Sequence, residues 1–226
     1  MARHSLYGMH IATATNIWSV VDELGVRPWK LIEEPTVVEY LQRDLTDQQR
    51  AEVARFCPMQ LARIWEIPDG KQATHFGLPQ LRNYSIIFSL IAGDFVPVTA
   101  QFRPNTKDID LQLPSGAIGT KANPLETVEE SGFREHREET GITLERVELL
   151  RSRPAPITVG HTGEKISFLL GHVKQPVEAK GLDLEEGEFL KAMLVPLADW
   201  LKLCETKGPD SVSLAATYMG LRRLGK

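Results

Sequence analysis

The spacing of apolar residues in the first 60 positions predicts helices. In residues 16–24 (NIWSVVDEL) apolar side chains recur at helical spacing, and Gly25 follows as a stop signal. Residues 46–56 open with Thr-Asp-Gln-Gln, which is similar to a capping box, while residues 34–41 are ambiguous between helix and strand. We therefore interpret residues 1–60 as a mainly helical N-terminal extension. Because nothing in it looks catalytic, we expect a packing layer on the main domain in preference to a dimer contact or a substrate lid.

Beyond residue 60 the pattern changes to the apolar runs that are typical of strands. The runs at 61–67 and 71–78 flank Pro68-Asp69-Gly70 and favour a hairpin, and residues 83–103 hold two apolar strands around a turn at Gly93-Asp94. Further strands are expected at 109–114, 145–159, 165–174 and 192–196, and helices at the end of 192–203 and at 211–224. This order predicts an α+β domain over residues 61–226, with a mixed sheet sandwiched between helices.

Three glutamates in the middle of the chain carry the candidate chemistry. Glu135, Glu138 and Glu139 stand at i, i+3 and i+4, which places them on one face of a helix. Carboxylates that close repel one another unless a positive charge lies between them, and a hard cation such as Mg²⁺ with its preference for oxygen ligands is the natural candidate. The alternative is a solvated helix face with ion pairs worth about 0.2–0.5 kcal/mol each.

The ends of this helix can be predicted from capping residues. It begins either at Pro124 with Asn123 as the cap, or at Val128 with Thr127 as the cap and Glu130 three residues later. Gly141 stands where a left-handed residue ends a helix.

Residues 116–142 resemble the Nudix box, G-x5-E-x7-R-E-U-x-E-E-x-G-U with U aliphatic. The matching residues are Gly116, Glu126, Arg134, Glu135, Glu138, Glu139, Gly141 and Ile142. The sequence departs from the pattern in two places. Nine residues separate Gly116 from Glu126 where the family has five, at a cost in closure entropy of only about 0.5 kcal/mol. His136 replaces an aliphatic residue, and we expect it to pack within the domain without a catalytic role.

The resemblance assigns roles to these residues. It implies a Nudix-like fold in which Glu135, Glu138 and Glu139 bind Mg²⁺ or Mn²⁺. Arg134 would then pair with Glu126 and orient the metal-binding face, whereas the alternative for Glu126 is a solvated acid in the first turn of the helix.

Three segments outside the box resemble the ADP-ribose and nucleoside-diphosphate-sugar branch of the family. Residues 100–104 (AQFRP) are similar to its Q-Y-R-P strand end, where Arg103 would contact the diphosphate or a neighbouring subunit; an exposed arginine is the alternative. Glu164 precedes a strand, as a substrate-binding acid does in relatives. The segment Glu186-Gly187-Glu188-Phe189 is similar to the loop that supplies the catalytic base, with Glu188 preferred over Glu186, or is merely a flexible acidic loop.

The resemblance therefore implies a metal-dependent hydrolase that cleaves a nucleoside diphosphate sugar, in the first place ADP-ribose to AMP and ribose 5-phosphate, and that forms a homodimer. Two alternatives stay open. The substrate is a different nucleoside diphosphate compound, such as a dinucleotide or a coenzyme, or the chain is a non-catalytic module that senses nucleotide sugars.

Composition excludes several other classes of protein. The net charge of −4 without a basic run argues against a nucleic-acid partner. No run of 18 apolar residues is present, so we expect no membrane span. The two cysteines, Cys57 and Cys204, are far apart in sequence and suggest reduced thiols in a cytoplasmic protein.

Overall fold

The structure is a computed structural model, and its described residues form two compact units. It describes residues 5–28, 43–50, 61–66, 72–77, 82–103, 106–120, 122–157, 164–174, 177, 180–184, 189–206 and 209–226. The first unit comprises 1–29, 82–155 and 165–226, and the second comprises 30–81 and 156–164.

The first sheet of the first unit has five strands in the order β1-β2-β12-β6-β7. Their bounds are β1 Ser5–Leu6, β2 Met9–Ile11, β12 Leu190–Pro196, β6 Phe95–Arg103 and β7 Asp108–Gln112. Strand β12 runs antiparallel to β6, with Met193 opposite Val98, and parallel to β2, with Met193 opposite His10. This sheet therefore joins the N-terminal residues to strands about 180 positions later in the chain.

The second sheet follows the order β10-β11-β5-β8, and β9 also pairs with β11. Its strands are β5 Tyr84–Ser89, β8 Ser115–Ala117, β9 Leu144–Leu149, β10 Ala155–Pro156 and β11 Lys165–Val173. Strand β5 is central and parallel to β11, and its apolar run is buried on both faces, as expected for a strand covered on two sides. The predicted turn at Gly93-Asp94 is present and leads the chain from this sheet into the first one.

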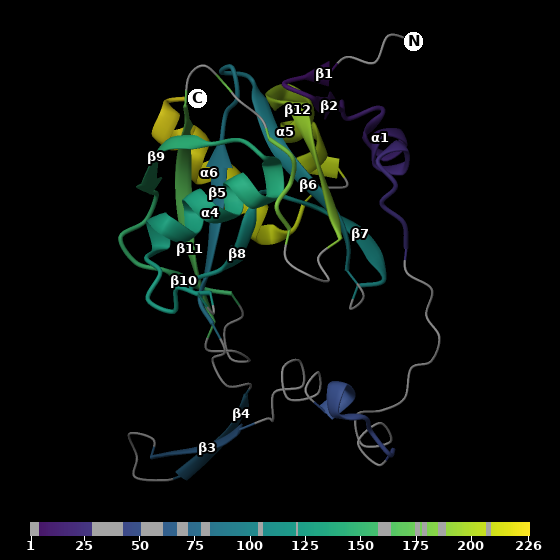
Figure 1. The fold of residues 1–226 in the computed structure, drawn as a ribbon. Helices are drawn as coiled ribbons and strands as arrows, with labels where there is room; N and C mark the ends of the chain where they lie inside the picture. The colour runs from purple at the N-terminus through teal and green to yellow at the C-terminus, as the bar shows by residue number, and fades with distance from the viewer. Residues whose placement is uncertain are drawn as a thin grey trace. The chain divides into compact units, whose positions relative to one another are not determined.

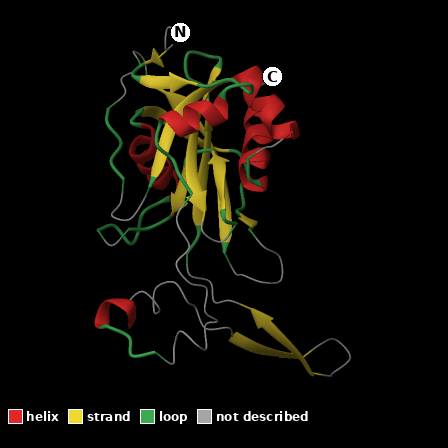
Figure 2. Ribbon diagram, turned by 90° about the vertical axis from the view of Figure 1, so that its right-hand side faces the viewer, coloured by secondary structure: helices red, strands yellow, loops and turns green. Residues whose placement is uncertain are grey.

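Helices cover both faces of the second sheet. Helix α4 (Val128–Thr140) lies on one face, where Ile87 and Leu169 form an apolar cluster with Leu144. Helix α6 (Ser211–Leu224) lies on the other, where Gly220 meets the ring of Phe88. Helix α5 (Leu197–Thr206) contacts β12 and β6. Strands thus lie between helices on either side (Figures 1 and 2).

The largest apolar cluster joins the two sheets with the helices. It contains side chains of β5, β6, β11 and β12 together with Trp200 of α5 and the buried face of α1 (Ile17–Glu23). The Trp200 indole N–H donates to Thr217 Oγ1 of α6 at 2.9 Å, so this large side chain has no unpaired polar atom.

The second unit contains the predicted hairpin strands. Strand β3 (Leu61–Glu66) pairs antiparallel with β4 (Gln72–Gly77), in a register that places Leu61 opposite Gly77. The capping box predicted at Thr46 is also present, because Gln49 N donates to Thr46 Oγ1 at 3.3 Å and Thr46 N donates to Gln49 Oε1 at 2.9 Å. The predicted segment 34–41 and turn 68–70 lie outside the described residues.

The predicted helical extension is not confirmed as a whole: among the described residues of 1–60, α1 and residues 47–50 are helical. Residues 5–11 form two strands that complete the first sheet, a pairing that short apolar pieces cannot reveal without their distant partner. The boundary between the two compact units does not lie at residue 60. Residues 5–28 belong to the first unit, and both hairpin strands belong to the second. The α+β class with strands between helices is confirmed. Among the described residues, no helix combines the length and apolar character that crossing a bilayer requires.

Candidate active site

Local signals at both ends fix the limits of helix α4. Thr127 Oγ1 accepts from Glu130 N at 3.2 Å, and the Glu130 carboxylate accepts from Thr127 N at 2.8 Å, which is a complete capping box. Gly141 adopts φ 72° at the other end, and its N–H donates to the carbonyl of Arg137. Of the two predicted helix starts, the structure has the one at Val128.

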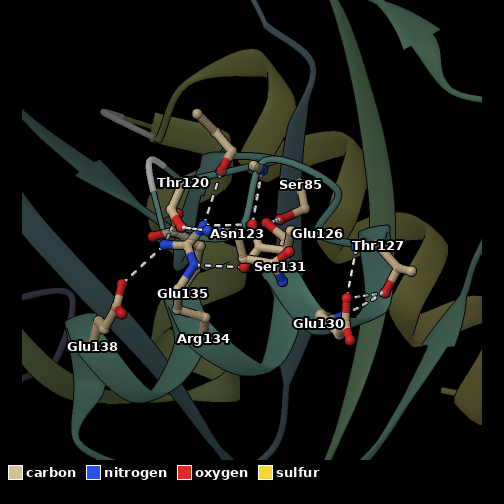
Figure 3. A network of polar contacts seen from close by, with 12 residues as sticks. Ser85, Thr120, Asn123, Glu126, Thr127, Glu130, Ser131, Arg134, Glu135 and Glu138 are labelled. Atoms are coloured by element: carbon tan, nitrogen blue, oxygen red, sulfur yellow. Dashed lines mark hydrogen bonds and ion pairs between the residues drawn. The ribbon is translucent and has the colours of Figure 1, made fainter.

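Close packing fixes α4 against the second sheet. Gly132 faces that sheet, and a Cβ there would come within 2.5 Å of the Leu169 Cδ1 atom. The backbone of α4 can therefore approach β11 closely because this position lacks a side chain. On the same helix the Arg134 guanidinium lies between Glu126 of the preceding loop and Glu138 of the next turn (Figure 3).

Arg134 is the centre of the polar network in this region (Figure 3). Its Nε donates to Glu126 Oε1 at 2.7 Å, and its Nη2 donates to Glu126 Oε2 at 3.0 Å and to the Ala117 carbonyl at 2.9 Å. Its Nη1 donates to Glu135 Oε1 at 2.7 Å and to Glu138 Oε2 at 2.9 Å. All five N–H groups of the guanidinium thus have acceptors. Hydrogen bonds to Glu126 chiefly, and then the charges of Glu135 and Glu138, raise the pKa of Arg134.

Glu126 keeps its contact with Arg134 in spite of the lengthened loop before it. Two hydrogen bonds join Thr120 to Asn123 within this loop: Thr120 N donates to the Asn123 carbonyl at 3.0 Å, and Asn123 N donates to Thr120 Oγ1 at 2.9 Å. Gly119 N then donates to Glu126 Oε2 at 2.8 Å. Burial acts to raise the pKa of Glu126, but the hydrogen bonds from Arg134 and Gly119 outweigh it and hold this pKa below its ordinary value.

Strand β8 positions two of the three predicted metal ligands. Ser115 N donates to Glu139 Oε2 at 3.0 Å. At the next residue, Gly116, an added Cβ would lie within 2.5 Å of all three carboxyl atoms of Glu135. Glycine is therefore required at position 116 by this contact with Glu135, and both glutamates are nearly buried, at 8% and 5% exposure.

Four carboxylates contribute to this network. The carboxylates of Glu126, Glu135, Glu138 and Glu139 converge on β8 and Arg134, and Arg134 is the cation that contacts three of them. Arg137 adds a weak contact, with its Nη2 3.9 Å from Glu138 Oε1 and its side chain 54% exposed. Such a set of hard oxygen donors fits a divalent cation of the Mg²⁺ type.

A cation would need a small rearrangement of these side chains. Within the described residues, no three His, Cys, Asp or Glu side chains already form a cluster that could hold a metal ion. Arg134 Nη1 donates to one oxygen of Glu135 and to one oxygen of Glu138. These two oxygens are therefore directed to the guanidinium and would have to turn to bind a cation.

His136 is a buried packing residue, as expected. Its Nδ1 is 2.9 Å from the Ile142 carbonyl and its Nε2 is 2.9 Å from Ser89 Oγ. Because a carbonyl only accepts, Nδ1 carries the proton and Nε2 accepts from the serine hydroxyl. Complete burial, which outweighs the Ile142 hydrogen bond, lowers the pKa of His136 to about 4, so the imidazole is neutral.

The other predicted site residues are less constrained. Arg103 Nη2 donates to Gln112 Oε1 of the neighbouring strand at 2.5 Å, which places the guanidinium at the end of β6. Glu164 belongs to the second unit, where its carbonyl accepts from Ile157 N at 3.1 Å. Glu186 and Glu188 lie outside the described residues.

Sequence reasoning missed the segment that holds the end of α4. Lys180 N donates to the Gly141 carbonyl at 2.8 Å, and Asp183 N donates to the Glu138 carbonyl at 3.0 Å. These contacts use backbone groups, which leave no signal in the sequence. Leu184, the next residue, lines a pocket of about 290 Å³ together with Arg27, Phe102, Phe189, Lys191 and their neighbours.

Comparison with known proteins shows the fold. Neither a protein-family model nor a curated protein matches the sequence. Among solved structures, one described as the crystal structure of an ADP compounds hydrolase superposes on this chain with a TM-score of 0.61. The two sequences are 19% identical, and the match covers 73% of this chain and 84% of that chain. The similarity shows that this chain has a Nudix-like fold.

Proposed function

We propose that this protein is a metal-dependent hydrolase that cleaves the pyrophosphate bond of a nucleoside diphosphate sugar, with ADP-ribose as its first substrate. The observation that carries the proposal is the convergence of four carboxylates on Arg134 and β8, on a helix with capped ends and beside a glycine that touches the Glu135 carboxyl group. The similar structure of an ADP compounds hydrolase supports the same reaction class.

The side chains of α4 would hold the cation. Glu135, Glu138 and Glu139 supply oxygen ligands, while Arg134 and Glu126 keep these ligands in place without touching the reacting bond. A bound divalent cation supplies charge neutralisation at the diphosphate and activation of water. Because a pyrophosphate offers little covalent chemistry to a protein, positioning and charge carry most of such a reaction.

The rest of the substrate would lie in the neighbouring pocket of about 290 Å³. Two of its lining residues are chain neighbours of residues near the proposed site: Phe102 directly precedes Arg103, and Leu184 directly follows Asp183, whose N–H donates to the backbone carbonyl of Glu138. The pocket contains two aromatic and two cationic residues, which suit a planar base or a sugar that carries phosphate. They are Phe102, Phe189, Arg27 and Lys191. We assign the proton acceptor to Glu188, with Glu186 second, on resemblance alone.

The decisive experiment is a turnover screen with Mg²⁺ or Mn²⁺. ADP-ribose, other nucleotide sugars, dinucleotides and coenzyme A are incubated with the wild-type protein, and release of phosphate monoesters is measured. We expect ADP-ribose to yield AMP and ribose 5-phosphate, and Glu138→Gln to lower kcat by at least 100-fold. Glu188→Gln and Glu186→Gln then identify the base.

Glu129→Gln is the matched control for Glu138→Gln. It removes the same charge from the same helix nine residues earlier, and nine steps of 100° place it on the opposite face. Turnover of the control should equal that of wild type. If Glu138→Gln and its control are equally active, the carboxylate face is not the metal site. If nucleotide sugars bind without metal and without turnover, the protein is a sensor and the proposal is wrong.

A further inference from the structure

A second pocket of the first unit lies at the C-terminal end of α4; of its described lining residues, Lys191 also lines the pocket that we assign to the substrate, and the others do not. Its volume is about 460 Å³, which is within the range of small-molecule sites. The described residues that line it come from the β1–β2 turn and strand β2, the C-terminal end of α1, the end of α4, the loop 180–182 and strand β12. They are Tyr7, Gly8, Met9, His10, Leu24, Thr140, Lys180, Gly181, Leu182, Lys191 and Ala192.

The charged side chains among the described residues that line this pocket are those of two lysines, in a protein whose net charge is negative. Lys180 and Lys191 are exposed and His10 is half-buried, and none of the described lining residues is acidic. Within the described part of the chain, neither lysine has a carboxylate oxygen within 4 Å. The net charge of the chain is −4, so this cluster departs from the average surface. Such a pocket attracts a dianion.

The turn at the edge of the pocket holds an aromatic residue in an unfavourable conformation. Leu6 pairs with Met9, so Tyr7 and Gly8 alone form the connection between β1 and β2. Both have positive φ, 53° and 80°, which is the combination of a type I′ hairpin turn. Asparagine or glycine readily adopts the positive φ of the first turn residue, whereas a bulky residue such as Tyr7 is strained there. The strain is compensated if the phenol contributes to a ligand site.

The pocket is linked to the α4 carboxylates through one short segment. Lys180 and Leu182 line it, and the same segment is hydrogen-bonded to Gly141 and Glu138 through Lys180 N and Asp183 N. A ligand that contacts both this segment and the β1–β2 turn would hold the segment more firmly against the end of α4.

We propose that this pocket is a binding site for a phosphate monoester of sugar size. The two lysines and His10 match the charge of the phosphate, while Met9, Leu24 and Tyr7 supply apolar surface for an organic part. The volume exceeds the need of a bare phosphate ion. The proposal does not rest on the hydrolase activity, because it concerns binding in the absence of metal.

Calorimetric titration in EDTA tests the site, with ribose 5-phosphate and inorganic phosphate as the probes. We expect saturable binding of ribose 5-phosphate, at least tenfold tighter than that of inorganic phosphate. Lys180→Gln should raise its Kd about tenfold, the loss expected for one charge-assisted contact. Tyr7→Asn should relieve the turn, keep or raise Tm, and still weaken binding about threefold. Neither residue lines the pocket that we assign to the substrate.

Lys202→Gln, an exposed lysine of α5, is the matched control and should leave the Kd within twofold of wild type. Ribose 5-phosphate should also slow hydrogen exchange at the amides of Lys180 and Asp183. Unchanged affinity in Lys180→Gln, equal loss in the control, or equal binding of inorganic phosphate would each overturn the proposal. If the Tyr7→Asn protein folds and binds ribose 5-phosphate with wild-type affinity, Tyr7 is not part of the site.

Discussion

The contact between Gly116 and Glu135 makes the sharpest test of the candidate site. Gly116 lies on β8 opposite Ser85, and its φ is not in the left-handed region, so alanine is compatible with the backbone there. The effect of Gly116→Ala is therefore steric. The new Cβ would overlap the carboxyl group of Glu135, which is 8% exposed and packed between β8 and Arg134.

The cost of Gly116→Ala follows from these contacts. Overpacking of this kind costs about 1–3 kcal/mol. If Glu135 turns away from the Arg134 Nη1 atom, a hydrogen bond between charged groups is also lost, at about 1.5–3 kcal/mol. We expect a total loss of about 3 kcal/mol in the free energy of unfolding, measured by urea denaturation in EDTA. If Glu135 is a metal ligand, as we propose, its displacement should also weaken Mn²⁺ binding about 10–100-fold, measured by calorimetry.

Two further glycine variants distinguish an effect on the candidate site from a general loss of packing. Gly220→Ala would press a methyl group into the ring of Phe88, so it should lose similar stability but keep Mn²⁺ affinity within twofold of wild type. Gly181 has nothing within 4 Å of an added Cβ, so Gly181→Ala should be neutral or stabilising by up to about 1 kcal/mol. If Gly116→Ala binds Mn²⁺ as tightly as Gly220→Ala does, then Glu135 is not a positioned ligand.

Two further predictions concern the neighbours of Glu135 on α4. His136→Gln should reduce the fall in unfolding free energy that we expect for wild type from pH 6.5 to 4. The folded imidazole has a pKa of about 4, so stability present above pH 6.5 is lost toward pH 4, by about 3 kcal/mol; equal slopes in urea unfolding would contradict this. Arg134→Lys should lose about 2–3 kcal/mol, because an ammonium cannot donate five hydrogen bonds. The control is Arg137→Lys, because the Arg137 side chain is exposed and its Nη2 lies 3.9 Å from Glu138 Oε1. Equal stability of the two variants would refute the role of the Arg134 guanidinium.

Local rules were sufficient for helix α4 and its acidic face. The cap at Thr127, the stop at Gly141 and the spacing of Glu135, Glu138 and Glu139 involve residues within a few positions of one another. Such signals can be read from one sequence because the interacting groups are neighbours in the chain. The same holds for the capping box at Thr46.

Distant pairings could not be read in this way. The hydroxyl of Ser89 that satisfies His136 is 47 residues away, and β2 pairs with β12 across most of the chain. The turn at Gly93-Asp94 was predicted, but not that it separates two sheets, since a tight turn between apolar strands is normally the sign of a hairpin. In each case the partner is selected by packing of the whole domain.

The network around Arg134 sets the conditions under which a cation can bind. The guanidinium is fixed on one side by both oxygens of Glu126 and by the Ala117 carbonyl, so it cannot follow Glu138 when that side chain moves. A cation that recruits Glu138 must therefore replace the hydrogen bond from Arg134 Nη1, which is worth about 1.5–3 kcal/mol. Glu139 is held by Ser115 and does not depend on Arg134 in this way. Of the three box carboxylates, Glu138 is accordingly the one whose position should differ most between the metal-free and the metal-bound protein.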